Sequence, residues 1–238
     1  MSGHNKWSSI KHKKAATDAK RAKVFTVAAR EITLAAQSGG GDPEMNAALK
    51  MAIEKARAVN MPKDNIQRAI KRGTGEAAEG ARIEEVVYEA MGPGGSAMMI
   101  VCATDNTNRA LTDVKTALKK NGGKFVSGGG VAFQFRHVGQ LALEGADADD
   151  LELAAIDAGA EDVEVQEDGT VVATTAVSDV HAVRSALEDA GVTVREMRIA
   201  YVPTQPVVLA EADRAAYEKL AEALDDVDDV QEIFDNVA

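Results

Sequence analysis

The chain has 238 residues, is 45% hydrophobic and carries a formal net charge of −11 at pH 7. This composition is that of a globular protein with a sizeable core. Its longest unbroken apolar run, residues 97–103, is far shorter than the roughly 20 residues of a membrane-spanning helix, so we expect no membrane contact. The single cysteine, Cys102, excludes an intramolecular disulfide. Because no signal sequence is recognised either, we expect a cytoplasmic protein.

The charge is divided unevenly along the chain. Residues 1–73 contain 15 Lys and Arg against 6 Asp and Glu, a net charge of +9, whereas the remaining residues carry −20. The sequence therefore predicts a basic module attached to an acidic body.

The basic module is predicted to be a bundle of three amphipathic helices. Apolar residues recur at helical spacing between residues 24 and 36, and the glycines at 39–41 end this first helix. A second helix is expected to begin at Pro43 with Asp42 as its cap, and a third to end at Gly73.

The rest of the chain is predicted to alternate between strands and helices. A hairpin is expected across residues 92–95, then a helix that ends at Gly122 and a strand over 131–135. Residues 137–203 follow the order βαββαβ of a ferredoxin-like split β-α-β fold. The segments on either side of 137–203 have too few elements to close a sheet alone, so we expect them to join as one domain.

These elements predict an α+β multidomain fold, with an N-terminal three-helix bundle and two ferredoxin-like α+β domains, one inserted in the other. The predicted domains are residues 1–75, residues 76–136 together with 204–238, and the inserted residues 137–203.

The sequence predicts no catalytic, metal or cofactor site. The four histidines do not have the spacing of an HExxH motif, and the Gly-rich stretches do not fit a P-loop. Cys102 lies in the most apolar run, which favours a buried thiol over a nucleophile. Two acidic clusters, residues 147–152 and 225–229, lack the glycine and glutamate of a calcium loop, and we interpret both as solvated charge. We therefore expect a protein that is not an enzyme.

Residues 104–109, with the sequence TDNTNR, are predicted to join a strand to a helix. Asn106 and Asn108 are suited to capping that helix. Arg109 opposes the dipole of the first helical turn, so we expect it either to pair with an acidic group or to bind an anion. These three residues are candidates for a contact with an anion or a partner.

The basic module carries the main functional signal. Seven cationic side chains fall between residues 6 and 23, opposed only by Asp18. Cations spaced like this suit nucleic-acid phosphates, although a solvated basic face is the alternative. Trp7 could stack on a base or be buried in the bundle. The predicted nucleic-acid-binding residues are Lys6, Trp7, Lys11, Lys13, Lys14, Lys20, Arg21, Lys23, Arg30, Arg68, Lys71 and Arg72.

Four segments appear in order along the chain: SGHNKWSSIKHKKAATDAKRAKVFT, DPEMNAALKMAIEKARAVNMPKDNIQRAIKRGTGE, YEAMGPGG and TDNTNRALTDVKTALKKNGG. They resemble the signatures of the YebC/PmpR family, and the similarity extends essentially from end to end. The resemblance implies a helical domain followed by two α+β domains, one inserted in the other, and no enzymatic activity. Family members are described as DNA-binding transcriptional regulators in bacteria, and related members as translational activators in mitochondria. Val27 stands where the family commonly has a lysine.

We therefore expect a DNA-binding transcriptional regulator that holds phosphates through its basic helical module. The alternative is a ribosome-associated translation factor that binds ribosomal RNA with the same module. The module offers only Trp7 and Phe25 for stacking on bases, which favours binding to a duplex backbone. A third hypothesis is an adaptor protein that has an acidic docking surface and does not bind nucleic acid directly. Under each hypothesis, the acidic α+β domains are a candidate surface for a protein partner.

Overall fold

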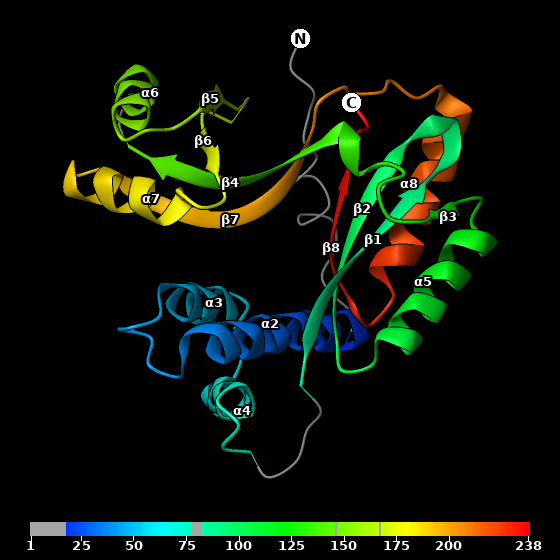
Figure 1. Ribbon diagram of the computed structural model, residues 1–238, viewed down its shortest axis with the longest axis horizontal. Helices are drawn as coiled ribbons and strands as arrows, with labels where there is room; N and C mark the ends of the chain where they lie inside the picture. The colour runs from blue at the N-terminus through cyan, green and yellow to red at the C-terminus, as the bar shows by residue number, and fades with distance from the viewer. Residues whose placement is uncertain (1–17, 78–81, 146, 167) are drawn as a thin grey trace. The chain divides into compact units, whose positions relative to one another are not determined.

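The computed structural model describes residues 18–77, 82–145, 147–166 and 168–238, with side chains from Ala22 onward (Figure 1). The described backbone divides into two compact units. The inserted unit is Phe135–Thr204, and the host unit contains the chain up to Gln134 together with Gln205–Ala238. The predicted three-domain boundaries remain a prediction, whereas the α+β fold class is as expected.

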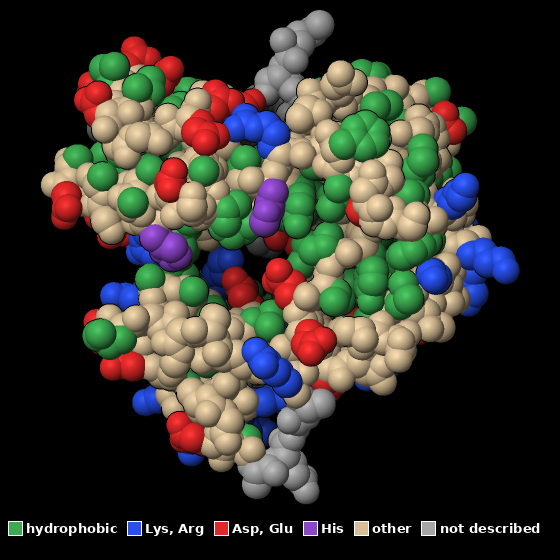
Figure 2. All heavy atoms as spheres, viewed as in Figure 1, with side chains coloured by type: hydrophobic (Ala, Val, Ile, Leu, Met, Phe, Trp, Pro, Cys, Tyr) green, Lys and Arg blue, Asp and Glu red, His purple; other side chains and the backbone are tan. Residues whose placement is uncertain are grey.

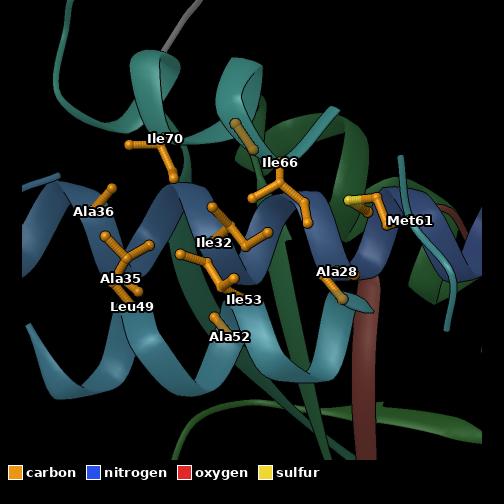
Figure 3. Packing of buried hydrophobic residues seen from close by; sticks show 12 residues of the cluster. Ala28, Ile32, Ala35, Ala36, Leu49, Ala52, Ile53, Met61, Ile66 and Ile70 are labelled. Carbon is orange, nitrogen blue, oxygen red and sulfur yellow. The ribbon is translucent and has the colours of Figure 1, made fainter. Parts of the chain in front are cut away.

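The first part of the host unit is helical. Its helices are α2 (Asp18–Gly39), α3 (Ala47–Ala58) and α4 (Lys63–Gly73). Alanine and isoleucine side chains from all three helices meet in one core, as Figure 3 shows for Ile32, Ile53 and Ile66. Small side chains let the helices approach closely. A Cβ at Gly73 would lie 2.5 Å from the backbone oxygen of Thr33, so α4 packs directly against α2.

Helix α3 begins later than the sequence predicts. Its cap is Asn46 rather than Asp42, because the Asn46 side chain accepts a hydrogen bond from the backbone N–H of Leu49. The Asn46 amide also donates to the carbonyl oxygens of Ala35 and Gly40, at 2.8 and 2.9 Å. One buried side chain thus starts α3 and satisfies carbonyl groups at the end of α2.

The second part of the host unit is a four-stranded antiparallel sheet of order β3-β1-β2-β8. Helices α5 and α8 pack against one face of this sheet and share a hydrophobic core with it. Cys102 is fully buried in this core, as predicted. Burial raises the pKa of the Cys102 thiol to about 12. The elements are β1 (Glu84–Met91), the short helix η1 (Pro93–Gly95), β2 (Ala97–Thr104), α5 (Thr107–Lys120), β3 (Lys124–Val126), α8 (Glu211–Asp225) and β8 (Val230–Asp235).

The strand predicted over 131–135 is wrong. Residues Ala132–Gln134 form a short 3-10 helix, η2, and the sheet takes its edge strand β3 from Lys124–Val126 instead. The carboxylate of Glu89 explains the difference, because it accepts the backbone N–H groups of Gly129, Val131 and Ala132 at 2.6, 2.7 and 2.9 Å. Those N–H groups are therefore occupied and cannot join a ladder.

The inserted unit follows the predicted order βαββαβ, with an antiparallel sheet of order β5-β6-β4-β7. A Cβ at Gly139 would lie 2.6 Å from Val180, so α7 packs tightly on β4. The unit has four Lys and Arg against fifteen Asp and Glu, a net charge of −11. Its elements are β4 (Phe135–Glu144), α6 (Ala148–Asp157), β5 (Asp162–Val165), β6 (Val171–Ala176), α7 (Val180–Asp189) and β7 (Thr193–Pro203). Within the described part of the chain, every helix is too short or too polar to cross a membrane.

The Glu89 carboxylate gives a first prediction. Burial raises its pKa, but the backbone N–H donors together lower it below the ordinary 4.5. A carboxyl whose pKa is lowered by folding adds stability at neutral pH, and this contribution is lost as the pH falls through the folded pKa. We expect Glu89→Gln to lower the free energy of unfolding at pH 7 by about 1–3 kcal/mol.

Urea unfolding at pH 7 and at acidic pH measures this effect, and the deficit of the variant should shrink as the pH falls below 4.5. Glu84→Gln, at an exposed position on the same strand, is the control and should change little. An equal loss in both variants, or a deficit independent of pH, would contradict the role given to Glu89.

Candidate nucleic-acid interface

The structure describes the side chains of only five of the predicted binding residues. Lys6, Trp7, Lys11, Lys13 and Lys14 lie outside the described residues. Lys20 and Arg21 belong to α2, but their side chains are also outside the described set. The five that remain are Lys23, Arg30, Arg68, Lys71 and Arg72.

Arg30 on α2 is bound to the loop between α8 and β8. Its Nη2 donates to Asp229 Oδ1 at 2.8 Å, and its Nη1 donates to the backbone oxygen of Asp228. The Asp229 side chain is only 1% exposed. A buried carboxylate needs a partner of this kind, because an unpaired buried charge is costly. Arg30 therefore joins the helical part of the host unit to its sheet.

The same carboxylate also binds Arg109 at the start of α5. Arg109 Nε donates to Asp229 Oδ2 at 3.1 Å, and its Nη2 lies 3.0 Å from both Asp229 oxygens and from Asp105 Oδ1. These carboxylates raise the pKa of Arg109 further above its usual range. Two roles were possible for Arg109, pairing with an acidic group or binding an anion, and in the structure it pairs with the acidic groups of Asp105 and Asp229. Asn106 caps α5 as predicted, since its side chain accepts from the Arg109 backbone N–H.

Two more of the predicted cations reach acidic residues of the host unit. Arg72 Nη2 at the end of α4 lies 3.3 Å from Asp105 Oδ2, and Lys23 Nζ lies 3.6 Å from Asp225 Oδ1. Burial raises the pKa of the Asp105 carboxyl, but hydrogen bonds from Arg109 and Arg72 bring it below its ordinary range. Lys23, Arg30 and Arg72 therefore all form ion pairs with the sheet part of the host unit.

Arg68 and Lys71 form the exposed basic edge of α4. They stand three residues apart, and both side chains face solvent. Arg68 donates to Asn65 Oδ1 at 2.5 Å, a neutral partner, so its charge is not neutralised by this bond. No ion pair to a carboxylate is found for either residue within the part of the chain that the structure describes. Among the predicted residues whose side chains the structure describes, this α4 basic edge is the part that can receive a phosphate directly.

Asp229 is the residue that the sequence interpretation missed. The sequence predicts solvated charge for the cluster 225–229, and for Asp229 this prediction is wrong, because its side chain is buried between two arginines. The one available signal is Arg109, whose position against the helix dipole predicts either an acidic partner or a bound anion. The other cluster agrees with expectation: Asp147 caps α6, and Asp149 and Asp150 lie exposed in its first turn. Among the described residues, no group of three or more His, Cys, Asp or Glu is placed to hold a metal ion.

Comparison with known proteins identifies the family. The family model described as the TACO1/YebC protein N-terminal domain matches residues 5–76. The model described as the TACO1/YebC second and third domain matches residues 83–237. The chain belongs to the YebC family. This confirms the resemblance carried by the four signature segments.

Members of the YebC family align with nearly the whole chain. A probable transcriptional regulatory protein of Thiobacillus denitrificans is 48% identical over 239 residues, which cover 99% of this chain and 98% of the relative. One of Neisseria gonorrhoeae is 48% identical over 235 residues, covering 98% and 97%. The crystal structure of a conserved hypothetical protein from Aquifex aeolicus matches with a TM-score of 0.84 at 38% identity, covering 98% of this chain and 97% of that one. The relatives from Thiobacillus denitrificans and Neisseria gonorrhoeae are thus named as probable regulators of transcription and not as enzymes.

The carboxylate of Asp229 gives a second prediction. Asp229→Asn removes the charge that Arg30 and Arg109 share, so two guanidinium groups lose their buried partner. We expect the free energy of unfolding to fall by about 3–5 kcal/mol, measured by urea denaturation. Asp228→Asn is the matched control, because the Asp228 side chain is exposed and only its backbone oxygen accepts from Arg30. Similar losses in the two variants would contradict the role assigned to the Asp229 carboxylate.

Proposed function

We propose that this YebC-family chain is a non-enzymatic, DNA-binding regulator of transcription that holds the phosphate backbone through its basic helical module. The observation that carries the proposal is the separation of charge: residues 1–73 have a net charge of +9, whereas the inserted unit has −11. Binding to a polyanion through cations is sequence-independent and strongly dependent on salt. The names of the relatives agree with a role in transcription.

The predicted residues divide into two roles in this proposal. The N-terminal cations from Lys6 to Arg21 and the α4 basic edge of Arg68 and Lys71 contact phosphates. Arg30 is committed to the buried Asp229, so we give it a positioning role that holds α2 against the sheet. Arg72 and Lys23 already neutralise carboxylates at 3.3 and 3.6 Å, which leaves less of their charge for a phosphate.

The acidic inserted unit fits the same proposal in two ways. Its charge repels a polyanion, so the nucleic acid approaches the basic module in a restricted orientation. Helix α6 also exposes Leu153 and Ile156 at 63% and 53%, one helical turn apart, beside the carboxylates of Glu152 and Asp157. We propose a positively charged protein as the partner of this unit, since exposed aliphatic side chains among carboxylates suit a basic, partly apolar surface.

A comparison of two binding measurements tests the proposal. Affinity for a duplex DNA is measured by fluorescence anisotropy at about 50 mM and about 200 mM salt, and ribosome association by co-sedimentation under the same conditions. We expect tight, salt-sensitive DNA binding. Strong ribosome association with DNA affinity at background would overturn the proposal in favour of a translation factor that binds ribosomal RNA. Binding to neither nucleic acid would favour an adaptor.

Substitution of the basic residues gives a third prediction. Lys11→Ala, Lys13→Ala and Lys14→Ala together, and separately Arg68→Gln with Lys71→Gln, should weaken DNA binding. Each phosphate contact that is lost should flatten the slope of log affinity against log salt by about 0.9. The matched control is Lys50→Gln with Arg57→Gln, an exposed lysine and arginine on α3. If the control weakens binding as much as the α4 variant does, net charge alone accounts for the effect.

A further inference from the structure

A second basic surface lies in the sheet part of the host unit, outside the predicted module. Residues 83–134 and 205–238 contain seven Lys and Arg and fifteen Asp and Glu. Five of these seven cations fall within Thr107–Val126, where Asp113 is the single acidic residue. A strongly acidic body therefore carries one local concentration of positive charge, on α5 and β3.

Polar and cationic side chains lie in a row along the exposed side of α5. Asn108, Thr112, Lys115 and Lys119 follow one another at spacings of four, three and four residues, which places them along one face of the helix. All four side chains are exposed, whereas Val114 and Leu118 of the same helix are buried against the sheet. Lys120 and Lys124 extend the positive charge beyond the end of the helix. We call Lys115, Lys119, Lys120 and Lys124 the α5 lysine stripe.

The stripe is visible at the surface of the molecule. Figure 2 shows Lys and Arg side chains gathered on the flank of the view where Figure 1 places α5 and β3. From Lys115 to Lys120, the lysines of the stripe that lie on α5, the helix rises by about 7.5 Å, at about 1.5 Å per residue. This length corresponds to about two base-pair rises of a duplex. Neighbouring phosphates of one strand could therefore lie along the stripe together.

The charges of the stripe are not neutralised by the protein. Across the residues that the structure describes, no ion pair joins any of the four ammonium groups to a carboxylate. The arginines nearby differ in this respect, because Arg72 and Arg109 are bound to Asp105 and Asp229. Cations without an internal partner are free to exchange their counterions for phosphates.

An ordinary structural role explains only part of the stripe. Lys119 and Lys120 in the last turn of α5 interact favourably with the helix dipole, as lysines at this position generally do. That role does not apply to Lys115 or Lys124. Lys115 lies over the Phe125 ring, 4.6 Å from its centroid, and this contact holds the charge beside β3. Lys115 and Lys124 thus keep positive charge at a place where helix stability does not require it.

Helix α5, which carries most of the stripe, begins close to the end of α4. The Arg72–Asp105 ion pair of 3.3 Å joins the last turn of α4 to the turn that precedes α5. Both basic surfaces belong to the host unit. The Arg72–Asp105 ion pair therefore holds the end of the helix that carries the α4 basic edge near the beginning of the helix that carries the stripe.

We propose that the α5 lysine stripe is a second phosphate-binding surface, which contacts the same DNA duplex as the basic helical module. This inference rests on the proposed function and adds a binding surface to it. The four lysines supply positive charge, and the exposed Asn108 side chain in the first turn of α5 adds a hydrogen-bond donor on the same face of the helix. The surface supplies affinity and orientation but no base readout, as phosphate contacts generally do.

The test compares wild type with the combined Lys115→Gln, Lys119→Gln and Lys124→Gln variant, using duplex DNA and fluorescence anisotropy across a salt series. We expect affinity to fall by about tenfold or more at low salt, and the slope against log salt to flatten by up to about 2.7, or 0.9 for each lost contact. Thermal unfolding confirms that the variant is folded. A single-residue comparison uses Lys119→Gln and the control Lys219→Gln, an exposed lysine on the adjacent helix α8.

The outcomes separate the two proposals. If wild type binds duplex DNA and the combined variant binds with the same affinity and slope, the α5 surface is overturned and the proposed function stands. If wild type does not bind duplex DNA, the proposed function fails, and the second surface with it. Equal effects of Lys119→Gln and Lys219→Gln would assign the loss to net charge and overturn the inference. Loss of ribosome association with unchanged DNA binding would overturn it as well.

Discussion

The host unit depends on one buried carboxylate that two arginines share. Asp229 receives Arg30 from α2 and Arg109 from α5, so a single acidic side chain connects the helical part, the first turn of α5 and the start of β8. Burial of a charge carries a desolvation penalty, which the surrounding guanidinium groups offset only if both keep their positions. The arrangement therefore adds specificity: the helices attach to the sheet in one position, because any other leaves charge buried and unpaired.

This interaction also decides which basic residues can serve function. A count of charges treats every lysine and arginine of the module alike. Arg30, however, forms a structural ion pair with the buried Asp229, whereas Arg68 binds only the neutral side chain of Asn65. Among the residues that the structure describes, Arg68 and Lys71 on α4 and the lysines of α5 remain exposed and form no ion pair with a carboxylate. The structure thus separates basic residues that hold the protein together from basic residues that face outward.

The periodicity of apolar residues is sufficient to predict most helices and strands, but it does not predict contacts between residues that are far apart in the sequence. The helical bundle and the βαββαβ order of the insert follow from apolar spacing, which acts locally. The strand expected at 131–135 failed because Glu89, some 40 residues earlier, takes the backbone N–H groups of that segment. The prediction that the Asp229 side chain is exposed is wrong because its partner Arg30 is 199 positions away in the chain. No local pattern contains either partner, so these features required the folded structure.

The insertion has a consequence for how the host sheet closes. Strand β8 comes from beyond the inserted unit, yet it pairs with β2 at Met98–Cys102, more than 120 residues earlier. Phe135 pairs with Pro203 at the junction of the insert, so the chain leaves and returns at one point. Once the insert has folded, its 70 residues no longer count in full as a flexible loop, and the entropy of bringing β8 to β2 falls accordingly. The folded acidic unit thereby helps the two separate segments of the host chain to pair as one sheet.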